Sequence, residues 1–285
     1  MFSWLTDWLK EILVNAATSQ INTTLTYINE SVASVSENVG QTPQGWNGSI
    51  YGIIHSLSEN VIIPIAGIIL TFVMVYELIQ LIMQKNNMHQ IESWMFFEWI
   101  FKTYVSVMLV THVWDIVNAI FDVGQQVVYQ AGGLIGTEAT VDPDSWTALI
   151  DGLNDKTIGE LLGICIVTVF ICMMMGILKI CIWVVLLARM MEIYMYTSLA
   201  PIPFATFVNK QFNHLGHNYV RSLLALAFQA FLIMICVAIY CVLISDISTS
   251  GDIIGSLWAA VGYSVLLCFT LFKTGSISKR IFGTF

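Results

Sequence analysis

The chain has 285 residues, of which 57% are hydrophobic and only 11% are charged, and its formal net charge is -8. Soluble domains carry about a quarter charged residues, so the composition excludes an ordinary soluble protein and favours a polytopic membrane protein. The acidic balance also argues against nucleic-acid binding as the main activity, because that activity usually needs a basic surface.

The N-terminal region, residues 1–60, is predicted to be an extracytoplasmic, interfacial helical region. From Met1 to about Ala17, apolar residues repeat at helical spacing opposite polar ones, which predicts an amphipathic helix. This helix either lies in the membrane interface or packs against the protein's own membrane helices. A second helix is predicted by four apolar positions at helical spacing: Ile21, Leu25, Ile28 and Val32.

Five later stretches are each long enough to cross a hydrocarbon core about 30 Å thick at about 1.5 Å of rise per residue. They lie at about residues 61–83, 94–121, 158–187, 222–244 and 253–272. The sequence therefore predicts an all-α polytopic membrane protein with about five transmembrane helices. Helices 1 and 2 fall within 61–121, a loop at 122–157 follows, and helices 3 to 5 fall within 158–285.

The distribution of charge predicts the orientation of these helices. Basic residues concentrate in the loop after the first span, in segment 189–221 and at the chain's end, which five spans would place on one side. Because basic loops stay in the cytoplasm, we expect the N-terminus outside and the C-terminus in the cytoplasm. The loop at 122–157 is then extracytoplasmic, and its glycine-rich run could line a path or contact a partner: Gly132, Gly133 and Gly136.

Pro201 and Pro203 interrupt the longest apolar run. Each proline lacks a backbone N–H and pushes the preceding residue, Ala200 or Ile202, toward extended geometry. We therefore expect a proline-broken corner on the cytoplasmic side. A basic segment surrounds it: Arg189, Lys210, His214, His217 and Arg221.

Charged residues inside membrane helices are costly and are functional candidates. Glu98 and Lys102 are four residues apart in the second span and are expected to pair. Asp115 is expected near the outer interface. Arg189 and Glu192, three apart, are expected to form a further pair.

Lys179 lies deep in the third span without a local acid. It can extend its ammonium group to the interface, pair with an acid of another helix, or face a wet cavity.

The motifs of familiar enzymes are missing from the sequence. It contains no phosphate-binding G-x-x-x-x-G-K-[ST] loop, no H-E-x-x-H and no G-x-S-x-G. His214 and His217 form an H-x-x-H pair, but two ligands do not close a zinc site, and a polar corner explains them better. We expect a non-enzyme without catalytic residues, metal or cofactor.

Several segments resemble one family along most of the chain. They are the opening MFSWLTDWLKEIL, the segment TPQGWNGSI at 42–50, VIIPIAGIILTFVMVYELIQ at 61–80, and the Leu-Ala-Pro turn at 199–201 followed by a polar, basic segment and the helix opening at Ser222. In these features the chain resembles the TrbL-type polytopic membrane subunits of conjugative type IV secretion systems, and specifically their Gram-positive branch.

The resemblance implies a channel or scaffold subunit in the cytoplasmic membrane that helps to pass DNA or protein across it. It implies further copies of the chain as a homo-oligomer, and the partners implied are other membrane subunits of the machinery, cytoplasmic ATPases, the lipid bilayer and, as a candidate, translocating DNA. The alternative is a secondary transporter or small-solute channel, which predicts inverted repeats and polar groups meeting at the midplane. No repeat is visible between the halves of the sequence.

Overall fold

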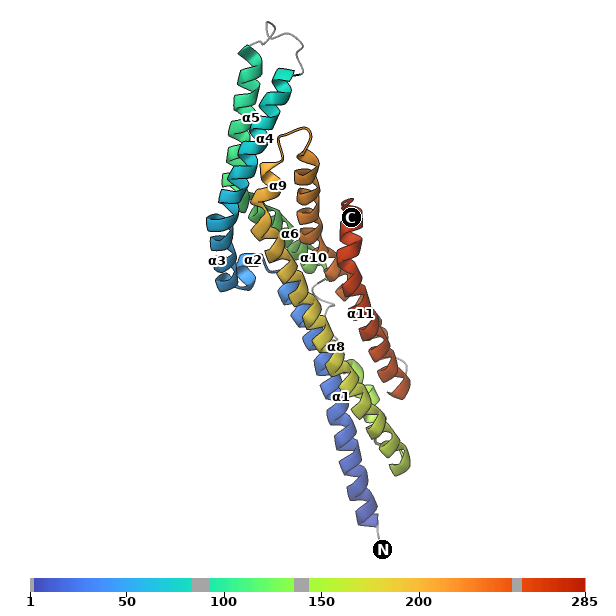
Figure 1. Ribbon diagram of the computed structural model, residues 1–285. Helices are drawn as coiled ribbons and strands as arrows, with labels where there is room; N and C mark the ends of the chain where they lie inside the picture. Colours follow the sequence, from blue (N-terminus) through green and yellow to red (C-terminus); the bar gives the residue numbers. More distant parts are fainter. Residues whose placement is uncertain (1–2, 84–92, 136–143, 248–252, 285) are drawn as a thin grey trace. The chain divides into compact units, whose positions relative to one another are not determined.

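The fold is taken from a computed structural model, which describes residues 3–83, 93–135, 144–247 and 253–284. Every regular element in these ranges is helical, which confirms the predicted all-α class (Figure 1). In chain order the elements are α1 (Ser3–Val39), α2 (Pro43–Trp46), α3 (Gly48–Leu57), the π-helical turn η1 (Ser58–Ile62), α4 (Ile63–Met83), α5 (Ser93–Thr111), α6 (Val113–Ile135), α7 (Asp144–Asp151), α8 (Ile158–Leu199), α9 (Pro201–Ala205), α10 (Asn213–Ile247) and α11 (Ile253–Ile281).

The chain forms two compact units. Unit 1 comprises Met1–Gly40, Val127–Ala188 and Ala230–Gly275, and unit 2 comprises Gln41–Gln126, Arg189–Gln229 and Ser276–Phe285. The helices α6, α8, α10 and α11 contribute residues to both units.

Unit 1 is built on α1 and the first part of α8, which lie side by side (Figure 1). The apolar face predicted for α1 is confirmed, since Ile21, Leu25, Ile28 and Val32 are all buried in its core. Segments of α10 and α11 complete this core. The predicted amphipathic helix and the helix after it are one continuous helix, because no Pro or Gly interrupts the sequence before Gly40.

Unit 2 is built on α4, α5 and α9, which pack against one another. Parts of α6, α8 and α10 add apolar side chains to the same core. In this unit α6 approaches α10 very closely. A Cβ atom added at Gly124 would lie 3.0 Å from the Cβ of Ala227, so any larger residue there would push the two helices slightly apart.

The candidate membrane spans agree with the sequence prediction in number. Among the described residues, four helical stretches are long and apolar enough to cross a membrane, at Gly48–Met83, Ile158–Ala205, Asn213–Ile247 and Ile253–Ile281. A fifth arises if the bent pair Trp94–Thr111 and Val113–Gly132 counts as one span. The protein is therefore a multi-pass membrane protein.

The second predicted span is not the continuous helix that the sequence suggested. It bends by 63° at His112, between α5 and α6. Side chains at the bend bond to the last turn of α5, where the Thr111 hydroxyl donates to the carbonyl of Val107 (3.0 Å) and the His112 Nδ1 lies 3.2 Å from that of Met108. Such side-chain bonds compete with regular helix geometry.

The loop predicted at 122–157 is also partly wrong, because residues 122–135 belong to α6 and a short helix, α7, follows. Gly132 and Gly133 are helical, whereas Gly136 lies outside the described residues. The reason is packing. Val117, Phe121 and Val128 form a buried stripe at helical spacing that outweighs the low helix propensity of glycine.

Candidate functional site

A connected polar group in unit 2 joins α4, α5 and the turn after α9. Lys102 on α5 lies between two carboxylates, with its Nζ 3.1 Å from Glu77 Oε1 and 3.0 Å from Glu98 Oε1. The predicted Glu98–Lys102 pair is therefore confirmed. The Glu98 side chain is 46% exposed, whereas the Glu77 side chain is 5% exposed. The Glu77–Lys102 pair therefore contributes more to the stability of unit 2 than the Glu98–Lys102 pair does, because a buried charge must be paired with an opposite charge.

The second oxygen of Glu77 is bound by the turn after α9. Asn209, which is fully buried, donates from Nδ2 to Glu77 Oε2 at 2.7 Å. Its Oδ1 accepts from the backbone N–H of Gln211 (2.8 Å) and of Phe212 (3.2 Å). The Asn209 amide is therefore fixed in orientation and ties the turn to the buried charge on α4.

A second set of bonds holds the same turn. The Gln211 side-chain oxygen accepts from the Tyr76 hydroxyl (2.8 Å) and from Gln80 Nε2 (2.9 Å), both on α4. Sequence reasoning missed Glu77 as a partner of Lys102. A usable signal existed, because both residues lie a similar number of positions from the connection between the first two spans, and paired antiparallel helices bring such positions to one level.

The two prolines act differently from the sequence expectation. Pro201 is the first residue of α9 and Pro203 lies inside it, so the helix is interrupted only at Ala200. Ala200 keeps helical dihedral angles (φ -51°, ψ -40°) and Ile202 is helical, so the expected extended geometry is wrong at both positions. Proline at the start of a helix needs no N–H partner, which explains why the chain stays helical. The reversal of direction follows instead in residues 206–212.

An apolar groove of about 420 Å³ lies beside this interruption in unit 2. It is lined by Met195, Tyr196, Leu199, Ile202, Pro203 and Tyr219. The Tyr219 hydroxyl donates to the backbone carbonyl of Tyr196, which fixes the start of α10 against the end of α8. Gly216 allows the start of α10 to lie close to α9 and the turn after it, since a Cβ there would lie 2.6 Å from a ring carbon of Phe207 and 3.0 Å from the carbonyl oxygen of Pro203.

Arg189 and Glu192 do not pair as predicted. Glu192 Oε1 instead accepts from Lys279 Nζ of α11 at 2.6 Å. Arg189 is only 6% exposed, and its Nε has no hydrogen-bond partner in the part of the chain that the structure describes. The prediction failed because it considered neighbours on one helix, whereas Lys279 reaches Glu192 from 87 residues away.

Lys179 has a partner on another helix, which was one of the three alternatives. Its ammonium group bonds to the Glu30 carboxylate on α1 and lies 5.2 Å from the centre of the Tyr27 ring. Both charged side chains remain partly exposed. The sequence contained no local signal for this pair, because 149 residues separate its members.

The remaining basic residues lie at the surface around the turn and the start of α10: Lys210, His214, His217 and Arg221. The His217 ring packs against Phe207, with 4.6 Å between ring centres. No group of three or more His, Cys, Asp or Glu side chains within the described ranges is arranged to hold a metal ion. Asp115 is exposed in the first turn of α6, one turn after the bend.

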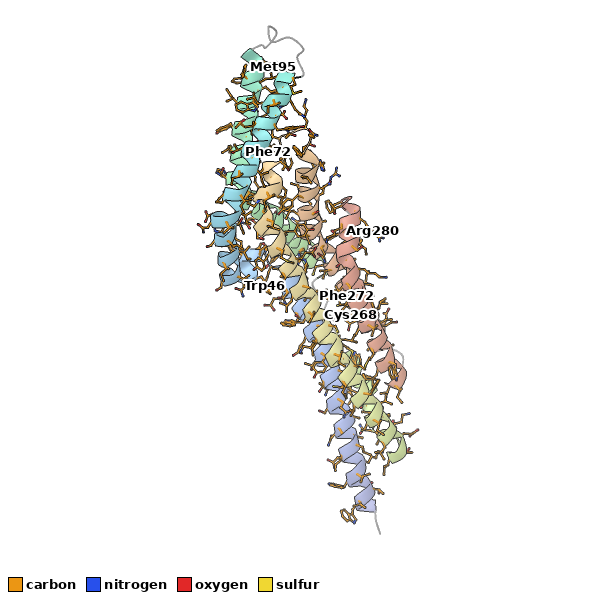
Figure 2. All side chains as sticks on the ribbon, in the orientation of Figure 1. Trp46, Phe72, Met95, Cys268, Phe272 and Arg280 are labelled. Carbon is orange, nitrogen blue, oxygen red and sulfur yellow. The ribbon has the colours of Figure 1, made fainter. Side chains whose placement is uncertain are left out.

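The outer surfaces of the membrane helices are apolar. On α4 and α11, side chains such as Phe72 (65% exposed) and Phe272 (61% exposed) point away from the helix axes (Figure 2). Surfaces of this kind are stable against lipid but not against water.

Comparison with known proteins identifies the family. Neither the curated proteins nor the solved structures that were compared gave a match to this chain. The family model of TrbL/VirB6 plasmid conjugal transfer like proteins matches residues 28–201, which is more than half of the chain. The chain therefore belongs to the TrbL/VirB6 family of plasmid conjugal transfer like proteins and is a multi-pass membrane component of conjugal transfer.

Proposed function

We propose that the protein is a channel or scaffold subunit of a conjugative type IV secretion system that helps DNA or protein to cross the cytoplasmic membrane. The observation that carries the proposal is the family match over residues 28–201, which includes the last third of α1 and all of α2 to α8. The match therefore covers much of the membrane-spanning structure rather than a peripheral segment.

In this proposal the protein is not an enzyme. Cytoplasmic ATPases supply the energy, and several copies of the chain, with other membrane subunits, surround the path. The absence of a nucleotide-binding loop from the sequence supports this division of labour.

We further propose that the N-terminus lies outside and the C-terminus in the cytoplasm, as the basic residues indicate. The turn at 206–212 and the start of α10 then form a cytoplasmic basic surface that contacts the ATPases. Its geometry supports a docking role, because Asn209 and Gln211 anchor the turn to α4 while Lys210 and His214 stay exposed.

The test is a donor strain with an in-frame deletion of this gene, complemented by a tagged copy. We expect the deletion to abolish transfer to recipients and the tagged copy to restore it. Detergent extraction followed by mass spectrometry should recover the ATPases and other membrane subunits with the tag. Normal transfer without the gene would contradict the proposal. Recovery of the chain alone, as a uniform oligomer with a measurable solute flux, would favour the transporter.

A further inference from the structure

One face of α1 is polar from Asn15 to Glu37. Between residues 15 and 37, the exposed positions are three or four residues apart, so they form one continuous stripe on the helix. Ala33 is the only apolar residue among them. The polar members, called the α1 stripe below, are Asn15, Ser19, Asn22, Thr26, Glu30 and Glu37.

The neighbouring helix α8 has the opposite surface. Between residues 161 and 188, every exposed position of α8 carries an apolar residue or glycine. The largest exposed side chains there include Ile166 (70% exposed), Met173 (64%) and Ile180 (62%). Such a face requires lipid, and this helix belongs to one of the candidate spans.

The helices α1 and α8 are joined at several levels within unit 1 (Figure 1). The Cys165 thiol donates to the Leu13 carbonyl at 3.3 Å, and the Thr168 hydroxyl bonds to the Gln20 side chain. Higher along both helices, Lys179 pairs with Glu30. Because the residue numbers rise together, the two helices run parallel, and α1 lies at the same depth in the membrane as the apolar part of α8.

The lengths of the two surfaces match a bilayer. From Asn15 to Glu37 the α1 stripe measures about 33 Å at 1.5 Å per residue, and the hydrocarbon core is about 30 Å thick. Carboxylates and amides are costly against lipid, so polar groups at this depth face a water-filled cavity or the interior of a bundle. The buried face of α1 is already occupied by the core of unit 1.

We propose that the α1 stripe lines a water-filled path at membrane depth. The inference rests on the proposed function, which supplies the path and the further copies that enclose it. It adds which residues line the path, since neither the sequence analysis nor the family match assigns residues to that role.

The chemistry of the stripe indicates how it treats a moving substrate. It carries hydroxyl, amide and carboxylate groups and no cation of its own, and the nearby Lys179 is matched by Glu30. Tight phosphate binding needs Lys or Arg. The stripe would therefore keep the path hydrated without binding DNA phosphates tightly, so that a substrate can move along it.

The inference also changes two parts of the predicted topology. If the start of α8 is outside, α1 begins outside and Val39 ends level with the cytoplasmic end of this α8 segment, so the α1 portion of residues 1–60, predicted as extracytoplasmic, would reach across the membrane. Because α8 again starts outside, α4 alone returns the chain across the membrane, and the bent pair α5 and α6 is then a re-entrant loop rather than the predicted second span.

Cysteine accessibility tests the inference in cells that carry the whole transfer machinery. Single cysteines replace stripe residues (Ser19→Cys, Asn22→Cys, Thr26→Cys), lipid-facing residues of α8 as matched controls (Ile166→Cys, Met173→Cys) and a core residue of α1 (Ile28→Cys). The probe is a charged, membrane-impermeant methanethiosulfonate. Thiols react as thiolates, which form in water and not in lipid. We expect reaction at the three stripe positions and none at the three controls, above the background of the native cysteines.

Three outcomes would overturn the inference. Stripe cysteines that resist the reagent as the Ile166→Cys control does would place the stripe in lipid. Stripe cysteines that resist it but form disulfides between copies would place it in a dry protein interface. Equal reaction at stripe and control positions would show that the whole unit lies outside the bilayer.

Transfer measured in the same cells separates this inference from the proposed function. If the reagent reacts with the stripe and blocks transfer, both stand. If it reacts and transfer continues, the wet stripe stands but is not on the transfer path. If deletion of the gene leaves transfer intact, the proposed function fails whatever the labelling shows.

Discussion

Asn209 donates a 2.7 Å hydrogen bond from its side-chain nitrogen to Glu77, a carboxylate that lies 132 residues earlier in the chain and is almost completely buried. This bond joins the turn after α9 to the charged pair formed by α4 and α5. Together with the bonds of Gln211 to Tyr76 and Gln80, it holds the basic surface at Lys210 and His214 in one position.

Replacing Asn209 should destabilise unit 2. Asn209→Ala leaves one Glu77 oxygen and two backbone N–H groups without their partner, and a buried unsatisfied group costs about 1–3 kcal/mol. The measurement is thermal unfolding of the purified protein in detergent.

Lys210→Ala is the matched control, because its side chain is exposed one residue away and such changes usually stay within about 0.5 kcal/mol. An unchanged melting temperature for Asn209→Ala would show that this bond does not hold the turn.

Removing Lys102 should cost more than removing Glu98. Lys102→Met leaves Glu77 as an uncompensated buried charge, for which losses of about 3–5 kcal/mol are typical. Glu98→Gln changes an exposed partner and should have little effect. Unfolding of the two variants in the same detergent makes the comparison.

The double variant Glu77→Gln/Lys102→Met should recover much of the loss, because Gln still accepts the Asn209 bond and no charge remains unmatched. If the double variant is as unstable as Lys102→Met alone, the buried charge is not the cause.

Reversing the Glu30–Lys179 pair tests the parallel register of α1 and α8. Lys179→Glu places two carboxylates together and should lower the amount of folded protein in membranes. Adding Glu30→Lys should restore it, since the pair is then reformed with opposite polarity. Membrane levels on immunoblots and transfer to recipients are the two readouts. Failure of the second change to restore either one would mean that the two residues are not neighbours.

Two glycines should respond to alanine in opposite directions. Gly124→Ala would bring a methyl group to 3.0 Å from Ala227 and 3.1 Å from its carbonyl oxygen, so α6 and α10 must separate and stability falls. Gly67→Ala on α4 has nothing within 4 Å and should gain up to about 1 kcal/mol from helix propensity. Melting temperatures of the two variants in one detergent check both signs, and a loss in both variants would argue against the close approach.

Cysteine labelling can test on which side of the membrane the basic surface lies. A cysteine at His214 should react with an impermeant reagent only after the cells are permeabilised. A cysteine at Asp246, which is exposed near the end of α10, should react in intact cells. Reaction of the His214→Cys variant from outside intact cells would refute the cytoplasmic placement.

Much of the fold is encoded in local patterns. The apolar stretches predicted the membrane helices, and the spacing of Ile21, Leu25 and Ile28 predicted the buried face of α1, because both signals arise from the period of a single helix. The pairing of Glu98 with Lys102 was predictable for the same reason, since residues four apart on a helix are neighbours. The TrbL resemblance also followed from the sequence, and the family match confirms it.

Contacts between distant segments were decided only by the tertiary structure. The partners of Lys179 and Glu192 lie 149 and 87 residues away, and Asn209 lies 132 residues from Glu77; no local spacing encodes such distances. The glycines of α6 were predicted to lie in a loop because glycine has a low helix propensity. The apolar core against which α6 packs could not be seen in the sequence. From the sequence alone, the α1 stripe indicates only a helix with one face in water. The tertiary structure packs α1 beside the lipid-facing helix α8, which places the stripe at membrane depth, where polar groups need a water-filled cavity.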